Sequence, residues 1–183
     1  IFGIPFVIQY SGGNCAMGKK QVYPLKGGLD TGMNYVILAK ADRLQKHRHA
    51  WKAWQVLKEF GCKTYLVAPG LDRFDGTKVF TDLESLATKV EKIDVVVPCL
   101  RNEYLEDLVS KCAAIKAKYI WFQENNGTRE MEEQCRVNGI GVVRGCVLKH
   151  KNFKKPFAYF HPCYWHGRKE IKVPDKHQIR GWK

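Results

Sequence analysis

Residues 34–69 read NYVILAKADRLQKHRHAWKAWQVLKEFGCKTYLVAP, and this stretch decides the fold class. The apolar run at 35–38 predicts a short buried strand. Residues 46–60 follow it with apolar side chains at helical spacing, namely Ala50, Ala53, Trp54 and Leu57. Gly61 ends the helical pattern, and residues 64–67 predict a second strand. The stretch therefore predicts a strand–helix–strand unit with parallel strands.

The same alternation continues to residue 150. Further strands are expected at 93–97, 119–122 and 141–143, and helices at 82–86, 104–115 and 129–137. Thr81 or Asp82 is the expected N-cap of the first of these helices, Thr128 is that of the last, and a glycine-containing loop is expected at 71–76. The pattern predicts an α/β domain over 35–150, a Rossmann-like open parallel sheet with helices on both faces.

Irregular extensions are expected on both sides of this domain. Residues 1–34 are rich in glycine and contain only a hint of a strand, so an extension is expected there. Residues 151–183 mix lysine and arginine with aromatic residues and proline. A disordered tail is usually poor in aromatic residues, so the C-terminal extension is expected to order against its own domain or against a partner.

Charge is distributed unevenly along the chain. The net charge is +13, and residues 151–183 carry nine basic against two acidic residues. Such an excess favours a polyanionic partner, and basic side chains interleaved with stacking rings suit RNA. The candidate RNA-binding residues are Lys46, Arg48, Lys151, Lys154, Lys155, Arg168, Lys169, Lys172, Lys176, Arg180 and Lys183.

The order of these segments resembles the small CoA-binding domains of Rossmann type, akin to the N-terminal domain of succinyl-CoA synthetase alpha. The resemblance covers about 35–150. It is carried by residues 36–38, 42–43, 66–69, 76–80 with 82–83, 93–96, 117–123 and 139–143 before Cys146. It implies a crevice for CoA whose pyrophosphate lies at the turn after the first strand.

The turn after the first strand departs from the pattern of that family. Where the resemblance implies a small glycine-containing turn, this chain has Ala39, Lys40 and Ala41, and it has Ala68 before Pro69 where Asn is usual. A methyl group at a close-approach glycine pushes a pyrophosphate away from the backbone amides, whereas Lys40 can hold a phosphate by charge. If CoA binding is retained, the resemblance points to Ala39, Lys40, Ala41, Arg43 and Pro69 as its contacts.

No catalytic or metal-binding constellation is evident from residue spacing, so the chain is not expected to be an enzyme. His161, Cys163 and His166 are ligand-capable and close together, but a fourth ligand is missing and ordinary surface residues are favoured over zinc. Gly12 and Gly13 do not precede a P-loop ending. The seven cysteines lack paired spacing, which indicates reduced thiols.

Three functions are compatible with this pattern. A preserved core, an altered cofactor turn and basic extensions are typical of structural proteins in large ribonucleoprotein particles, so the first hypothesis is a mitochondrial ribosomal protein in the matrix, contacting rRNA and other ribosomal proteins. The alternatives are a CoA or acyl-CoA binding protein, and an accessory subunit of a mitochondrial membrane complex. No stretch approaches the roughly 20 apolar residues that span a bilayer.

Overall fold

The computed structural model describes residues 29–124, 126–150 and 160. Its elements in chain order are β1 (Asn34–Leu38), α1 (Ala41–Gln45), α2 (His49–Glu59), β2 (Lys63–Val67), β3 (Arg73–Phe74), β4 (Thr77–Phe80), α3 (Leu83–Ala87), β5 (Val95–Pro98), η1 (Asn102–Tyr104), α4 (Leu108–Ala114), β6 (Tyr119–Phe122), α5 (Arg129–Val137), β7 (Gly141–Arg144) and η2 (Val147–His150). The predicted extensions fall outside the described residues, apart from 29–34 and 160.

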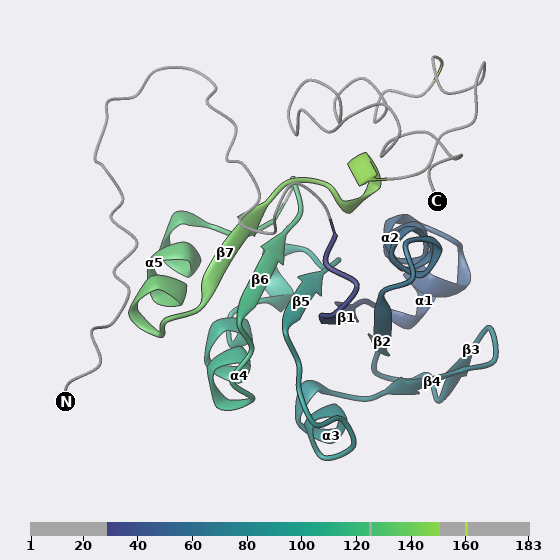
Figure 1. Cartoon of the computed structure of the whole chain (residues 1–183), viewed down its shortest axis with the longest axis horizontal. Helices are drawn as coiled ribbons and strands as arrows, with labels where there is room; N and C mark the ends of the chain where they lie inside the picture. Colours follow the sequence, from purple (N-terminus) through teal and green to yellow (C-terminus); the bar gives the residue numbers. More distant parts are fainter. Residues whose placement is uncertain (1–28, 125, 151–159, 161–183) are drawn as a thin grey trace.

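One seven-stranded sheet organises these elements, in the order β3-β4-β2-β1-β5-β6-β7 (Figure 1). The six strands from β4 to β7 are parallel, and only β3 runs antiparallel to its neighbour β4. β1 lies in the middle, where Ile37 is level with Leu66 of β2 and Val97 of β5. The predicted open parallel sheet of Rossmann-like type is confirmed.

Alternate residues of β1 pack against different helices. Tyr35 and Ile37 belong to an apolar cluster with α2 residues such as Trp54, whereas Val36 and Leu38 belong to a second cluster with residues of α3, α4 and α5. Figure 1 shows α1 and α2 on one side of the sheet and the other three helices on the opposite side. Because both faces are covered, the parallel strands are apolar without strict alternation.

The helix predicted for about 46–60 is present as α2, which begins three residues later, and the sequence did not predict the short helix α1 before it. α1 begins already at Ala41, and the chain breaks at Lys46 to Arg48 before α2 begins at His49. His47 has a positive φ of 49°, a left-handed conformation that no α-helix contains. The four apolar residues predicted to face the core from this region are all buried in α2.

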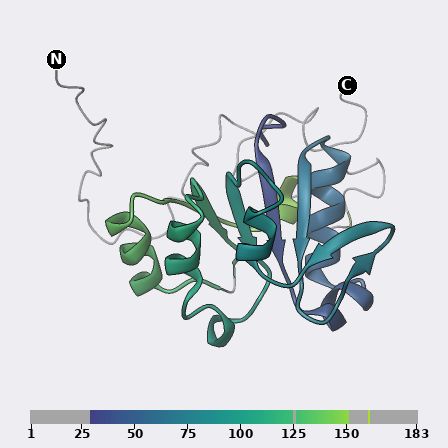
Figure 2. The same ribbon diagram turned by 90° about the horizontal axis from the view of Figure 1, so that it is seen from below.

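Two further segments differ from prediction. The helix predicted for 104–115 is shorter: η1 ends at Tyr104 and α4 begins only at Leu108. The loop predicted for 71–76 contains β3, which forms a hairpin with β4 that projects at one end of the sheet (Figure 2). Asp75 and Gly76 both have positive φ, as a two-residue hairpin turn requires.

Both predicted N-cap positions are confirmed by side-chain bonds. Oδ1 of Asp82 accepts a hydrogen bond of 2.6 Å from the Ser85 amide, which decides between Thr81 and Asp82. Thr128 Oγ1 accepts one of 3.3 Å from the Met131 amide at the start of α5. Within the described part of the chain, none of the helices combines the length and hydrophobicity that crossing a membrane requires.

Candidate functional site: a cationic crevice at the strand-order switch

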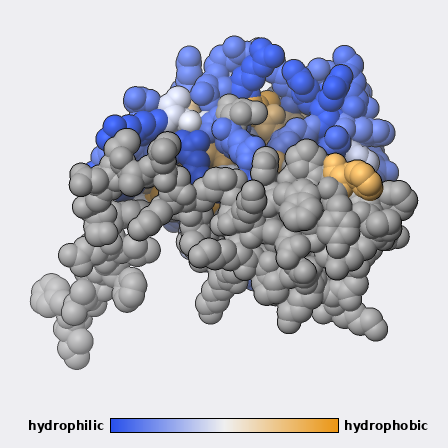
Figure 3. Space-filling model, turned by 90° about the horizontal axis from the view of Figure 1, so that it is seen from above, coloured by the Kyte–Doolittle hydropathy of each residue, from blue (hydrophilic) through white to orange (hydrophobic). Residues whose placement is uncertain are grey.

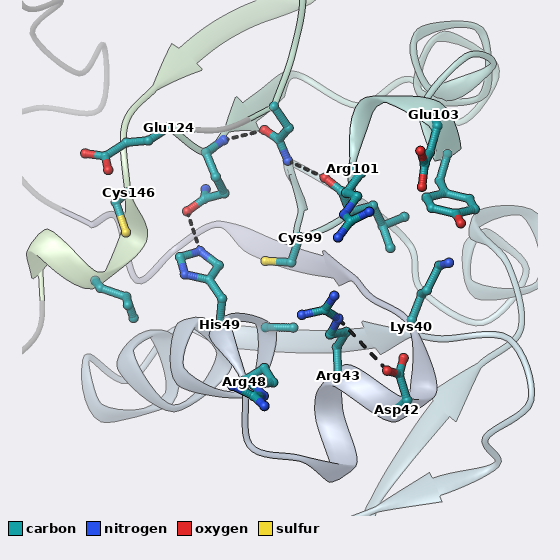
Figure 4. Close-up of a pocket in the computed structure, with 16 residues that line it drawn as sticks. Lys40, Asp42, Arg43, Arg48, His49, Cys99, Arg101, Glu103, Glu124 and Cys146 are labelled. Carbon is teal, nitrogen blue, oxygen red and sulfur yellow. Dashed lines mark hydrogen bonds and ion pairs between the residues drawn. The ribbon is translucent and has the colours of Figure 1, made fainter.

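The strand order reverses between β1 and β5, and in open α/β sheets ligands bind at such a switch, beyond the carboxyl ends of the strands. We call this side of the sheet the carboxyl edge and the opposite side the amino edge. A crevice of about 820 Å³ lies at the carboxyl edge (Figure 4). Its walls come from residues that follow β1, β5, β6 and β7, together with the beginning of α2.

The turn from β1 to α1 forms one wall of the crevice. Ala39 is 2% exposed, and its amide donates a 3.0 Å hydrogen bond to the Val67 carbonyl. The Arg43 amide donates to the Lys40 carbonyl at 3.0 Å, and Asp42 places a carboxylate in the first turn of α1. Because α1 has only five residues and carries this acid in its first turn, the turn does not fit a pyrophosphate bound by backbone amides.

Lys40 crosses from this turn to the opposite wall. Its Nζ lies 3.4 Å from the centroid of the Tyr104 ring, a close cation–π contact. Tyr104 in η1 is half exposed and borders both the crevice and a second hollow described below. The contact between Lys40 and Tyr104 therefore lies where the two spaces meet, across the path of an extended ligand.

Cations outnumber acids along the crevice, four against three, the acids being Asp42, Glu103 and Glu124. Arg43, Arg48 and Arg101 line it together with Lys40, and Figure 4 shows Arg43 and Arg101 reaching into it from opposite walls. Arg43 has only a long ion pair of 4.0 Å with Asp42. Among the described residues, Arg48 and Arg101 form no ion pair. This charge favours an anionic group in the crevice.

A neutral hydrogen-bond network forms the floor. His49 Nε2 lies 3.2 Å from Gln123 Oε1, which also accepts the Val147 amide at 3.0 Å. The amide oxygen can only accept, so the His49 ring donates from Nε2. Burial lowers the pKa of His49 and outweighs this hydrogen bond, which favours the charged ring. The ring is therefore held neutral at physiological pH.

Cys99 and Cys146 also line the crevice, and Cys99 lacks the properties of a nucleophile. Burial raises the pKa of the Cys99 thiol to about 12, so it remains protonated at neutral pH. None of the five cysteines within the described residues is in a disulfide, as their spacing predicts. Groups of three or more metal-ligating side chains are absent from the described residues, and His161, Cys163 and His166, for which the sequence disfavours a zinc site, lie outside them.

A second hollow of about 350 Å³ lies on the other side of Tyr104, between the ends of β1, β2 and β4. Ala39 and Pro69 contribute to its apolar part. Five carboxylates line it against a single lysine, Lys111; they belong to Asp82, Glu84, Glu103, Glu106 and Asp107. A nucleotide that crosses a Rossmann crevice would enter this hollow, where the acids disfavour its phosphates.

The binding residues predicted from the sequence therefore lie in different parts of the structure. Lys40, Arg43 and Arg48 meet in the crevice, whereas Ala39 and Pro69 lie in the second hollow. Ala41 is the first residue of α1, and Lys46 is exposed outside the crevice. The remaining RNA-binding candidates lie outside the described residues: Lys151, Lys154, Lys155, Arg168, Lys169, Lys172, Lys176, Arg180 and Lys183.

Sequence reasoning missed Arg101, Tyr104, His49 and Gln123 as crevice residues. Arg101 and Gln123 follow the ends of β5 and β6, so the rule that ligands bind beyond strand ends at a switch point would have identified both. Tyr104 and His49 do not directly follow a strand end. Their positions depend on η1 and on the break between α1 and α2, which the sequence did not predict.

The sequence profile of the CoA binding domain family matches residues 36–151. The chain belongs to this family. A search of curated proteins found no match. The departure of the β1–α1 turn from the family pattern is thus a feature of a true member.

Solved structures share the fold at low identity. A hypothetical protein from Pyrococcus horikoshii OT3 is 20% identical, with 69% of this chain and 91% of that chain covered and a TM-score of 0.54. Cell-free ID.343 from Thermus thermophilus is 19% identical, with 62% and 84% covered and a TM-score of 0.53. The redesigned PH1109 protein is 22% identical, with 62% and 78% covered and a TM-score of 0.55.

Proposed function

We propose that this chain is a structural component of a mitochondrial ribosome, located in the matrix, in which a CoA binding domain serves as a folded body rather than as an enzyme. The observation that carries the proposal is the β1–α1 turn. It keeps the family's position but presents Ala39, the Lys40–Tyr104 contact and the Asp42 carboxylate where a pyrophosphate needs backbone amides. A domain altered in this way retains its folded core, which can then serve a structural role.

The charge of the chain supports RNA as the partner. A net charge of +13 favours a dense polyanion, and ribosomal RNA is such a partner. Basic residues are concentrated at 151–183, beyond the domain, and others surround the crevice. Basic segments of this kind would contact rRNA while the folded body contacts neighbouring ribosomal proteins.

Sedimentation of the native protein from mitochondrial extracts tests this proposal. We expect it to move with a ribosome-sized particle, to be released by RNase, and to dissociate steeply as salt increases. A free small species would contradict the proposal. Movement with a membrane complex that RNase and salt leave intact would instead favour an accessory subunit of that complex.

A second candidate function is binding of CoA or acyl-CoA, and the cationic crevice favours it. Its volume of about 820 Å³ is within the usual range for ligand sites, and Lys40, Arg43, Arg48 and Arg101 attract phosphates by charge. Calorimetric titration of the full chain with CoA separates the two functions. Saturable binding that Arg101→Ala abolishes would favour the second; no binding at millimolar CoA favours the structural role.

A further inference from the structure

We infer that the corner between α1 and α2 binds an unpaired segment of RNA through cations and an exposed histidine ring. The basic corner consists of Arg43, Lys46, His47, Arg48 and Trp51. This inference rests on the proposed ribosomal function and places one of its RNA contacts on the folded domain, independently of residues 151–183.

The charge of the basic corner is not neutralised within the described residues. Lys46 and Arg48 are exposed and form no ion pair there, and Arg43 has only the 4.0 Å contact with Asp42. Arg43 and Arg48 also line the crevice (Figure 4). The cations therefore form a continuous track from the crevice, where Arg101 lies, to the exposed corner, and such a track suits a phosphate backbone.

The backbone at His47 is unusual for the residue type. Four helices end with the same pair of hydrogen bonds, in which the residue after the C-cap adopts a positive φ: His47 after α1, Gly61 after α2, Lys116 after α4 and Gly139 after α5. Glycine is the usual residue in this motif, because other residues lose about 1 kcal/mol in the left-handed region. The chain uses glycine at two ends but keeps histidine at the basic corner.

The His47 ring is placed for stacking. Its centroid lies 4.5 Å from that of the Trp51 ring at an interplanar angle of 36°, and 6.4 Å from that of Phe74 in β3. His47 is exposed, whereas Trp51 and Phe74 are half-buried beneath it. Two aromatic rings thus support a third ring that faces solvent between cations. A ring supported in this way offers a stacking surface to a base.

An unpaired strand fits this surface better than a duplex. Bases inside a duplex are stacked on each other, so an exposed ring gains little from them, whereas an unpaired base can stack on a side chain. An acidic protein would use the cations but would have no need of the His47 ring. The ring therefore decides between partners that the charge alone cannot separate.

Charge reversal in the purified full chain tests the cation track. The probe is a fluorescent oligouridine of about 12 nucleotides, a length that spans such a site. We expect the triple variant Arg43→Glu, Lys46→Glu, Arg48→Glu to weaken binding at least tenfold and to reduce the log–log salt slope by about 2. The control carries the same change at the amino edge, Lys63→Glu, Lys89→Glu, Lys116→Glu, and should bind within about threefold of wild type.

Glycine replacement separates the histidine ring from its backbone role. His47→Gly relieves the left-handed strain, so the protein should unfold at the same or a higher urea concentration, yet its affinity for the oligouridine should fall about fivefold. Lys116→Gly makes the same backbone change in the same motif and also removes a cation. It should leave the affinity unchanged.

Three results would overturn the inference: equal weakening by the two triple variants, wild-type affinity of His47→Gly, or tighter binding of a duplex than of the single strand. If the native protein still sediments with ribosomes in an RNase-sensitive manner, the proposed function survives this failure and the RNA contacts lie elsewhere. If sedimentation also fails, both are wrong.

Discussion

Each of the two edges of the sheet contains a buried polar side chain that joins neighbouring segments, but the chemistry differs. At the amino edge, the Asp94 carboxylate is 2.9 Å from Lys92, 3.2 Å from Lys118 and 3.1 Å from the Asn34 amide. At the carboxyl edge, the Asn126 side chain donates to the Pro98 and Leu100 carbonyls at 2.6 and 3.0 Å and accepts the Gln123 amide at 2.7 Å. One connection is charged and the other is neutral.

The difference decides which cations remain available. At the amino edge the buried acid neutralises two lysines, so this edge offers little to an external anion. At the carboxyl edge the amide connects β5 to β6 without adding charge, and Arg48 and Arg101 form no ion pair among the described residues. On the face that Figure 3 shows, the described residues are mostly hydrophilic. The crevice is distinguished by its arginines, since Arg48 and Arg101 have no acidic partner among the described residues.

The largest expected effect on stability comes from removing the neutral Asn126 side chain at the carboxyl edge. Asn126→Ala leaves two buried backbone groups and one partly buried group without their partner and should reduce the free energy of unfolding by about 3 kcal/mol. The effect should be the same from pH 5 to pH 8, because no titrating group is removed. Urea unfolding measures it. Asn102→Ala, which removes one exposed bond to the Gly127 amide, is the control and should cost under about 1 kcal/mol.

Two glycines, one near each edge, allow the cost of an added side chain to be compared. Gly127, near the carboxyl edge, has φ 80°, and an added Cβ would lie 2.5 Å from the Phe122 ring. Gly139, near the amino edge, has φ 69° with open space around it. Gly127→Ala should therefore cost about 2 kcal/mol, from strain plus clash, and Gly139→Ala about 1 kcal/mol, from strain alone. Equal urea midpoints for the two variants would contradict this reading.

The charged connection should be sensitive to acid. Burial opposes ionisation of Asp94, but hydrogen bonds from Lys92, the Asn34 amide and Lys118 outweigh it and hold the pKa below its ordinary value. A depressed pKa stabilises the fold above the unfolded pKa, near 3.9, and this contribution is lost as pH falls through the folded pKa.

Asp94→Asn should therefore cost about 1.5 kcal/mol at pH 7 and progressively less below about pH 4. Urea unfolding of both proteins between pH 3 and pH 7 measures the difference. A cost that does not change over this range would show that the carboxylate charge contributes nothing.

The smallest effect concerns His49 at the crevice floor. Its pKa is lowered, chiefly by burial, so the unfolded chain binds the proton more tightly than the fold does. Stability should fall as pH drops below about 6.5, the unfolded value. His49→Gln should show a shallower decline of the urea midpoint between pH 7 and pH 5. Equal slopes would mean that burial does not control this histidine.

Local patterns in the sequence were sufficient for most of the fold. The apolar runs predicted five of the six parallel strands, all except β4, and the residues at 119–122 and 129–137 predicted β6 and α5 with their observed bounds. Asp82 and Thr128 marked helix starts, because a cap is decided by neighbours three residues away. β3 was missed because two residues carry no periodic signal.

The candidate site was predicted only in part. Ala39, Lys40 and Arg43 could be identified from the sequence, because the turn after a first strand has a known role in such sheets. Arg101 and Tyr104 are sixty residues further along the chain, and their approach to Lys40 depends on the crossover that sets β5 beside β1. Patterns within a few residues of sequence cannot predict which charged side chains such a crossover brings close together.

The sequence by itself determined the α/β class, the order of the elements, the glycine-free turn and the net charge of +13, since these depend on composition and short-range spacing. Only the tertiary structure decided that α1 and the left-handed His47 precede α2, that cations outnumber acids in the crevice while the second hollow is acidic, and that Lys40 lies on Tyr104. The physical reason is range: caps and periodicity act within a few residues, whereas the field at a site is the sum of charges that distant segments bring together.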